Sequence, residues 1–159
     1  MRVLQILAQA CAVLAGVLLT LITLMTCVSL TGRNTVGWTL VGDVEIVGFV
    51  AGAAVALFMP WCQLRRSNII VDFFTARASA ATQAGLDRFG ALLLCAVMVL
   101  MTWRTGIGGL NAWKSNSGSM MLGLPEWLVY VGMVPPLALT AVIALVQALH
   151  GESAQGGAA

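Results

Sequence analysis

The stretch from Val3 to Gly32 contains no charged side chain, and this restricts the fold more than any other feature of the sequence. About 20 consecutive apolar residues in a helix cross the hydrocarbon core of a bilayer. A helix bonds all its backbone polar groups within one segment, as a lipid environment requires. Only 9% of all residues are charged, against about 25% in a typical soluble domain. The sequence therefore predicts an integral membrane protein.

Charged residues divide the chain into four apolar runs, and each run is long enough for one span. We expect transmembrane helices at about residues 5–31, 41–63, 89–113 and 125–149. The fold class predicted is an all-α membrane protein with one domain, residues 1–150. Residues 151–159 are small and polar, which favours a disordered cytoplasmic tail.

The distribution of positive charge predicts the orientation. If the N-terminus lies inside, the cytoplasmic side carries more arginine and lysine than the outer side, as the positive-inside rule requires. Both termini should then lie in the cytoplasm, and the protein should be a multi-pass protein of a bacterial inner membrane. The cytoplasmic residues are Arg2, Arg65, Arg66, Arg77 and Arg88, and the outer ones are Arg33 and Lys114.

The segment "LRRSNIIVDFFT", residues 64–75, follows the second predicted span. Its apolar residues fall on one face of a helix and its charged residues on the other, a pattern typical of helices in the membrane plane. We predict an in-plane amphipathic segment at about residues 65–88, with a plain cytoplasmic loop as the alternative. The expected inner-interface anchors, embedded in membrane lipid, are Arg65, Arg66, Ile70, Asp72, Phe73 and Phe74.

Charged residues within the predicted spans are candidates for function, because charge is costly in a membrane. Glu45 begins the second span and Arg104 lies in the outer half of the third. The two spans are antiparallel, so both side chains should lie at a similar depth. We predict an interhelical ion pair between them, with a proton or ion relay as the alternative.

Small residues and prolines indicate how the spans pack and bend. In the second span, small residues recur every four positions. This spacing predicts close contact with another helix through Gly48, Gly52 and Ala56. Prolines inside the second and fourth spans remove backbone donors and should bend these helices at Pro60, Pro135 and Pro136.

Residue types that carry catalytic or cofactor chemistry are missing or isolated. The four cysteines lie in apolar runs without metal-type spacing, and His150 is the one histidine. No phosphate-binding loop or nucleophile elbow occurs. We therefore predict no enzyme activity, no cofactor and no metal. A net charge of +2 without a basic cluster argues against a nucleic-acid partner.

Two stretches of the chain resemble a known transporter family. These are "GDVEIVGFVAGAAVALFMPWCQLRRSNIIVDFFT" and "LGLPEWLVYVGMVPPLAL". The first has an acid at the start of a span and an arginine-containing exit before Val-Asp. The second has a proline-aromatic opening and a mid-helix proline. In this order, they resemble the small permease (DctQ-like) subunit of tripartite ATP-independent periplasmic (TRAP) transporters.

That resemblance implies a function that the residues alone do not give. It implies a small subunit that binds and scaffolds a large permease subunit, with a periplasmic binding protein as a further partner. Transport would be sodium-driven uptake of an organic acid. One alternative is the small subunit of another tripartite carboxylate transporter.

Two other classes fit the residues less well. An independent four-helix small exporter needs a carboxylate in the first span, which has none. A redox enzyme or haem anchor needs cysteine pairs in loops or histidines in spans, and neither occurs.

Overall fold

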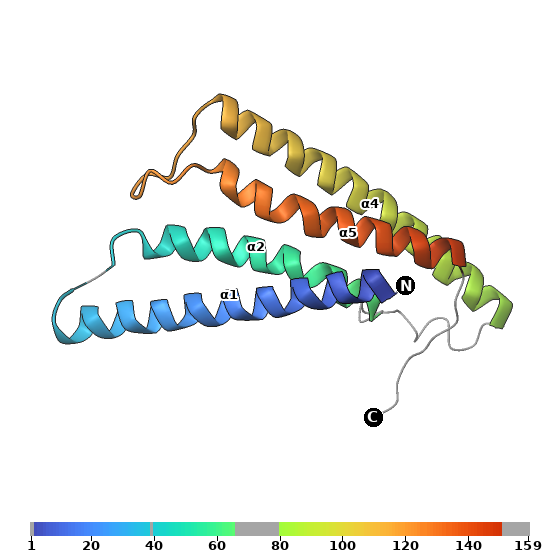
Figure 1. The fold of residues 1–159 in the computed structure, drawn as a ribbon, viewed down its shortest axis with the longest axis horizontal. Coiled ribbons are helices and arrows are strands. Elements are labelled where there is room, and N and C mark those ends of the chain that lie inside the picture. Colours follow the sequence, from blue (N-terminus) through green and yellow to red (C-terminus); the bar gives the residue numbers. More distant parts are fainter. Residues whose placement is uncertain (1, 39, 66–79, 151–159) are drawn as a thin grey trace.

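The computed structural model describes residues 2–38, 40–65 and 80–150 (Figure 1). Within these ranges the chain forms four helices: α1 (Arg2–Thr35), α2 (Asp43–Leu64), α4 (Ala80–Lys114) and α5 (Trp127–His150). Each is long and apolar enough to cross a membrane. The described residues contain no strand, only an isolated bridge between Gly118 and Pro125. The predicted all-α membrane fold is confirmed.

Part of the predicted in-plane segment and the predicted tail lie outside the described residues. These parts are residues 66–79, with five of the six expected interface anchors, and residues 151–159. Residues 80–88, which the sequence pattern assigns to the in-plane segment, form the first turns of α4.

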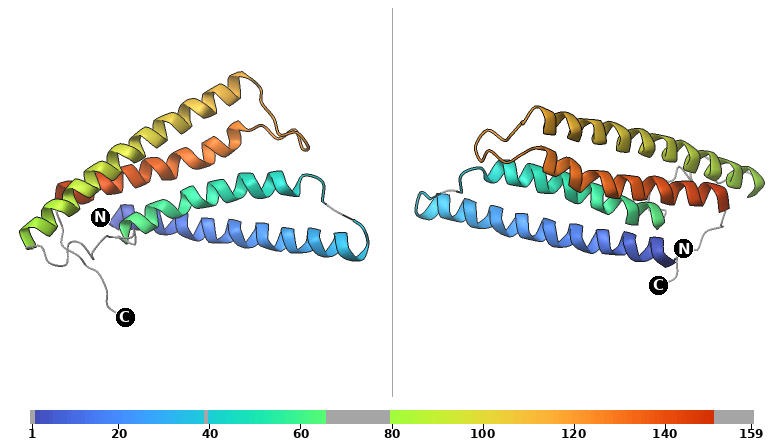
Figure 2. Two further views of the ribbon diagram at one scale, coloured as in Figure 1. Left: turned by 180° about the vertical axis from the view of Figure 1, so that it is seen from behind. Right: turned by 45° about the horizontal axis from the view of Figure 1, so that its top comes forward.

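The helices lie side by side as an open row and do not close into a bundle. The order across the row is α1, α2, α5, α4 (Figures 1 and 2), and each helix packs mainly on its neighbours in this order. The chain thus forms two antiparallel hairpins, α1–α2 and α4–α5, joined through α2 and α5. We call the end with residues 36–42 and 115–126 the loop end. The end where α1 begins and α5 finishes is the terminal end.

The first hairpin packs along one narrow seam. The buried residues of α1 are spaced by seven, which places them on a single face: Ala8, Ala15, Ile22 and Ser29. Such spacing is typical of helices that cross at a small angle. The alanines Ala8 and Ala15 are fully buried, so small side chains allow close approach of α1 and α2.

The centre of the row is α5, which has neighbours on both sides. In the most apolar 18-residue stretch of α5, one third of the residues are buried. In the corresponding stretch of α4, at the edge, 6% are buried. A cluster joins α2, α4 and α5 through the buried residues Ala56, Met98, Leu137 and Ala141. The three prolines lie inside continuous helices. The Thr140 hydroxyl donates a hydrogen bond to the Pro136 carbonyl at 2.8 Å. Bending at these prolines stays a prediction.

Candidate functional site

The two hairpins are tied together at the loop end by the carboxylate of Glu45. Its Oε1 accepts the N–H of Met121 at 2.9 Å, and its Oε2 accepts the N–H of Leu122 at 3.2 Å. Hydrogen bonds to an ionised acceptor are stronger than neutral ones. We call these three residues the loop clasp. The clasp holds the loop between α4 and α5 against the start of α2.

The clasp replaces the predicted ion pair between Glu45 and Arg104. Among the described residues, the structure contains no ion pair between these two side chains, because Glu45 is bonded to the loop. Helix α5 lies between α2 and α4 in the row (Figure 1), so Arg104 is not on a neighbouring helix. Arg104 is instead exposed on α4.

Gly42 allows the loop to approach α2 so closely. It precedes α2 with φ +80°, a left-handed conformation that favours glycine. A Cβ at this position would lie 2.5 Å from Cγ of Leu122. Both the backbone angle and the space beside it therefore require glycine here.

The start of α2 is also bonded to α1. The Ser29 hydroxyl, in the buried seam, donates to Oδ2 of Asp43 at 2.7 Å. Asp43 lies in the first turn of α2, where the helix dipole favours negative charge. Both acids at the start of this helix thus hold neighbouring segments in place.

The loop at residues 115–126 is compact and has its own hydrogen bonds. The N–H of Ser119 bonds to the carbonyl of Leu124 at 2.9 Å, and the N–H of Gly123 bonds to the carbonyl of Ser119 at 3.1 Å. Gly123 supplies a positive φ of 64°. Met120, at the tip, is fully exposed. The loop therefore presents a fixed apolar tip at the loop end.

A polar contact that the sequence patterns above do not predict joins α2 and α5 near the terminal end. The amide of Gln63 donates to Oε1 of Gln147 at 2.8 Å, and the amide of Gln147 donates to the Gln63 carbonyl at 3.0 Å. Gln63 is 6% exposed. A signal for this contact is present in the sequence, since a glutamine stands near the end of two apolar runs. Two residues after Gln63, the Arg65 guanidinium lies 4.7 Å from the ring centroid of Trp61.

The predicted small-residue row differs from the packing in the structure. A Cβ added at Gly48 or Gly52 would meet no atom within 4 Å. Ala56 is buried in the central cluster with residues of α4 and α5. Close helix contact through all three small residues stays a prediction.

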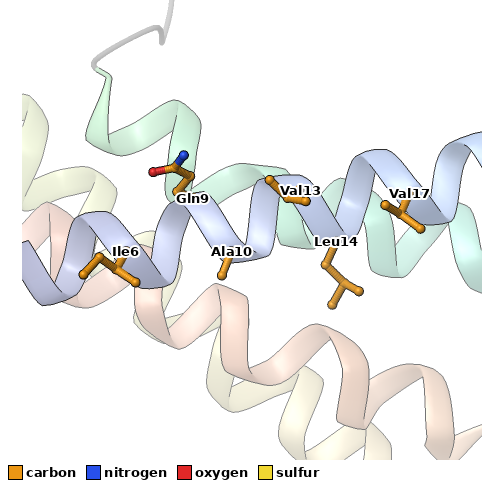
Figure 3. A pocket seen from close by; sticks show the side chains of 6 residues that line it. All are labelled: Ile6, Gln9, Ala10, Val13, Leu14 and Val17. Atoms are coloured by element: carbon orange, nitrogen blue, oxygen red, sulfur yellow. The ribbon is translucent and has the colours of Figure 1, made fainter.

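Two hollows on the row are lined without charged side chains. One, of about 490 Å³, runs along α1 and is lined by apolar residues and Gln9 (Figure 3). The other, of about 340 Å³, lies between α4 and α5 near the loop end and contains Trp113, Trp127 and Tyr130. The two indoles meet edge to face with centroids 4.8 Å apart.

The described residues contain no group of three or more side chains suited to hold a metal ion. Apart from hydrogen bonds within single helices, their polar side-chain contacts join helices and loops to one another. The fold and contacts thus define a multi-pass membrane protein with four apolar helices whose polar side chains work as connections.

Comparison of the sequence with protein families identifies the class further. The sequence model of the family described as "Tripartite ATP-independent periplasmic transporters, DctQ component" matches residues 22–153. The chain belongs to this family of transporter components, as the resemblance in the sequence predicted. Comparison with curated proteins and with solved structures gave no match.

Proposed function

We propose that this chain is the small membrane subunit of a TRAP transporter, without enzyme activity of its own. It binds and scaffolds the large permease subunit for sodium-driven uptake of an organic acid, which a periplasmic binding protein delivers. The observation that carries the proposal is the family match over residues 22–153.

The open row of helices supports a scaffolding role. A row one helix thick exposes apolar side chains on both faces, and large exposed apolar residues occur on all four helices. Neither hollow has a charged side chain in its lining, so neither offers the carboxylate of an organic acid a positive group. Apolar faces without such groups suit contact with lipid and with another membrane subunit.

The proposal places the loop end in the periplasm and both termini in the cytoplasm of a bacterial inner membrane. The charges of the described residues support it, since Arg2, Arg65 and Arg88 lie toward the terminal end and Arg33 and Lys114 lie at the loop end. Arg65, one of the expected interface anchors, stacks on Trp61 at the end of α2.

In this orientation the loop that Glu45 holds faces the compartment of the binding protein. Its exposed tip at Met120 lies beside the clasp. We include the loop at residues 115–126 in the surface that meets the binding protein, with Arg33 and Lys114 as positive residues at the same end of the molecule.

The proposal can be tested by co-expression with a large TRAP permease subunit and a binding protein encoded beside this chain. The tagged chain should recover the large subunit in a fixed ratio. Proteoliposomes that contain both should take up an organic acid when the binding protein and a sodium gradient are supplied. Uptake of equal rate without this chain, or no recovery of a large subunit, would contradict the proposal.

A further inference from the structure

Arg104 is a charge within a membrane span for which the described residues offer no ion-pair partner. It is exposed on α4, and the two acids at the start of α2 are bonded elsewhere. Ten residues separate it from Lys114 at the loop end, which is about 15 Å along a helix. Arg104 therefore lies well inside the hydrocarbon region, where an unpaired charge is unfavourable.

The direction of the helix makes a lipid headgroup a poor partner. Side chains on a helix tilt toward its N-terminus. For α4 this direction points away from the nearer membrane surface at Lys114 and toward the farther surface, beyond Arg88. The guanidinium of Arg104 thus begins its reach toward the middle of the bilayer. A lysine or arginine near the N-terminal end of a helix reaches the headgroups much more easily, because its side chain already points toward the nearer membrane surface.

The neighbouring helix α5 lacks two backbone donors at a similar depth. Gly109 lies against Tyr130, so Arg104, five residues before it, lies at about the level of Pro135. Because Pro135 and Pro136 have no N–H, the carbonyls of Val131 and Gly132 lack their helical donors. The charge of Arg104 on α4 and the prolines of α5 thus lie at a similar depth inside the membrane, among apolar side chains.

We propose that the face of α4 around Arg104 binds a transmembrane helix of the large permease subunit, and that this helix presents an aspartate or glutamate to Arg104. The inference rests on the proposed function and specifies its contact. Helix α4 lies at the edge of the row, and only 6% of the residues in its most apolar 18-residue stretch are buried. Leu100 and Met101, one turn from Arg104, are about half exposed. These apolar side chains surround the charge pair and exclude lipid from it.

The test compares Arg104→Leu and Arg104→Glu with the control Arg33→Leu, which removes an exposed arginine at the loop end of α1. Each variant is co-expressed with the large subunit, and its recovery by the tagged small subunit is titrated in lipid nanodiscs. We expect both Arg104 variants to weaken binding about tenfold or more, because each leaves a buried carboxylate unpaired. The control should bind as wild type does.

A second measurement separates this role from a structural one. Since Arg104 has no ion-pair partner among the described residues, Arg104→Leu should leave the stability of the isolated chain in bicelles unchanged or raise it. A lowered stability in the isolated chain would overturn the proposal, since Arg104 would then act within the subunit. Replacement of one membrane-embedded acid of the large subunit by arginine should restore binding to Arg104→Glu.

The remaining outcomes identify other partners of Arg104. If Arg104→Leu binds the large subunit as wild type does but retains less anionic phospholipid in native mass spectrometry, the partner is a lipid phosphate and the proposal fails. Loss of a cross-linked dimer of this chain would identify a second copy as the partner, and the proposal would fail in that case too. Failure of the wild-type chain to bind any large subunit would refute the proposed function itself.

Discussion

Replacement of Gly42 by alanine tests how closely the loop packs on α2. Gly42 has φ +80°, and an added Cβ would lie 2.5 Å from Cγ and 2.7 Å from Cδ1 of Leu122. A left-handed conformation costs a residue with a Cβ about 1–2 kcal/mol. Forcing an additional carbon into a packed contact costs about 1–3 kcal/mol. We therefore expect Gly42→Ala to lower the free energy of unfolding by about 2–5 kcal/mol.

Gly37 is a matched control for the backbone contribution. It has φ +71°, yet a Cβ added there would meet no atom within 4 Å. Gly37→Ala should therefore cost only about 1–2 kcal/mol. The difference between the two variants measures the contact with Leu122. Unfolding by SDS in mixed micelles, followed by tryptophan fluorescence, gives both values.

A double variant isolates the contact itself. Leu122→Ala removes the atoms that the new Cβ would meet, so Gly42→Ala should cost less in this background than in the wild type. Equal cost of Gly42→Ala and Gly37→Ala, or an unchanged cost of Gly42→Ala in the Leu122→Ala background, would refute close packing of the loop on α2.

Three further predictions concern other connections. Glu45→Gln should speed amide hydrogen exchange in the loop at residues 115–126, because an amide accepts through one oxygen only; unchanged exchange would contradict the loop clasp. Gln147→Leu removes two hydrogen bonds to Gln63 and should cost about 0.6–1.7 kcal/mol in the same unfolding assay; a more stable variant would show that the pair adds nothing. Ala15→Leu should cost about 1–3 kcal/mol by forcing α1 from α2, whereas Gly16→Ala, which adds a Cβ in open space, should cost little; similar effects would argue against the seam.

The membrane fold could be predicted from the sequence because each charged side chain is excluded from lipid by itself, whatever the other helices do. Arg33, Asp43 and Lys114 lie at or near ends of helices in the structure, where the sequence placed the limits of the apolar runs. Membrane spans depend on local composition, so no knowledge of which helices touch is needed to find them.

The partner of Glu45 could not be found in this way. Depth along the membrane suggested Arg104, but the order of helices across the row places α5 between them, and no residue pattern specifies that order. The actual partners are backbone N–H groups of Met121 and Leu122. Every residue except proline has such a donor, so the sequence contains no signal for the clasp.

Other contacts did have a signal in the sequence. The seam of α1 follows a spacing of seven from Ala8 to Ser29, and a search for this period would have found it. Gln63 and Gln147 are polar residues in apolar runs, which favours an interhelical hydrogen bond. The small-residue row at Gly48 and Gly52 had the same kind of signal, but spacing alone does not say which face meets a neighbour.

The joining of two hairpins through α2 and α5 also bears on how the chain is made. Residues close in sequence form each hairpin, so the translocon can release α1–α2 as a paired unit while α4 and α5 are still being synthesised. The contact between α2 and α5 can form only after the last helix has entered the bilayer. The Gln63–Gln147 pair and the loop clasp both cross between hairpins. They therefore form late in biogenesis, once the second hairpin lies beside the first.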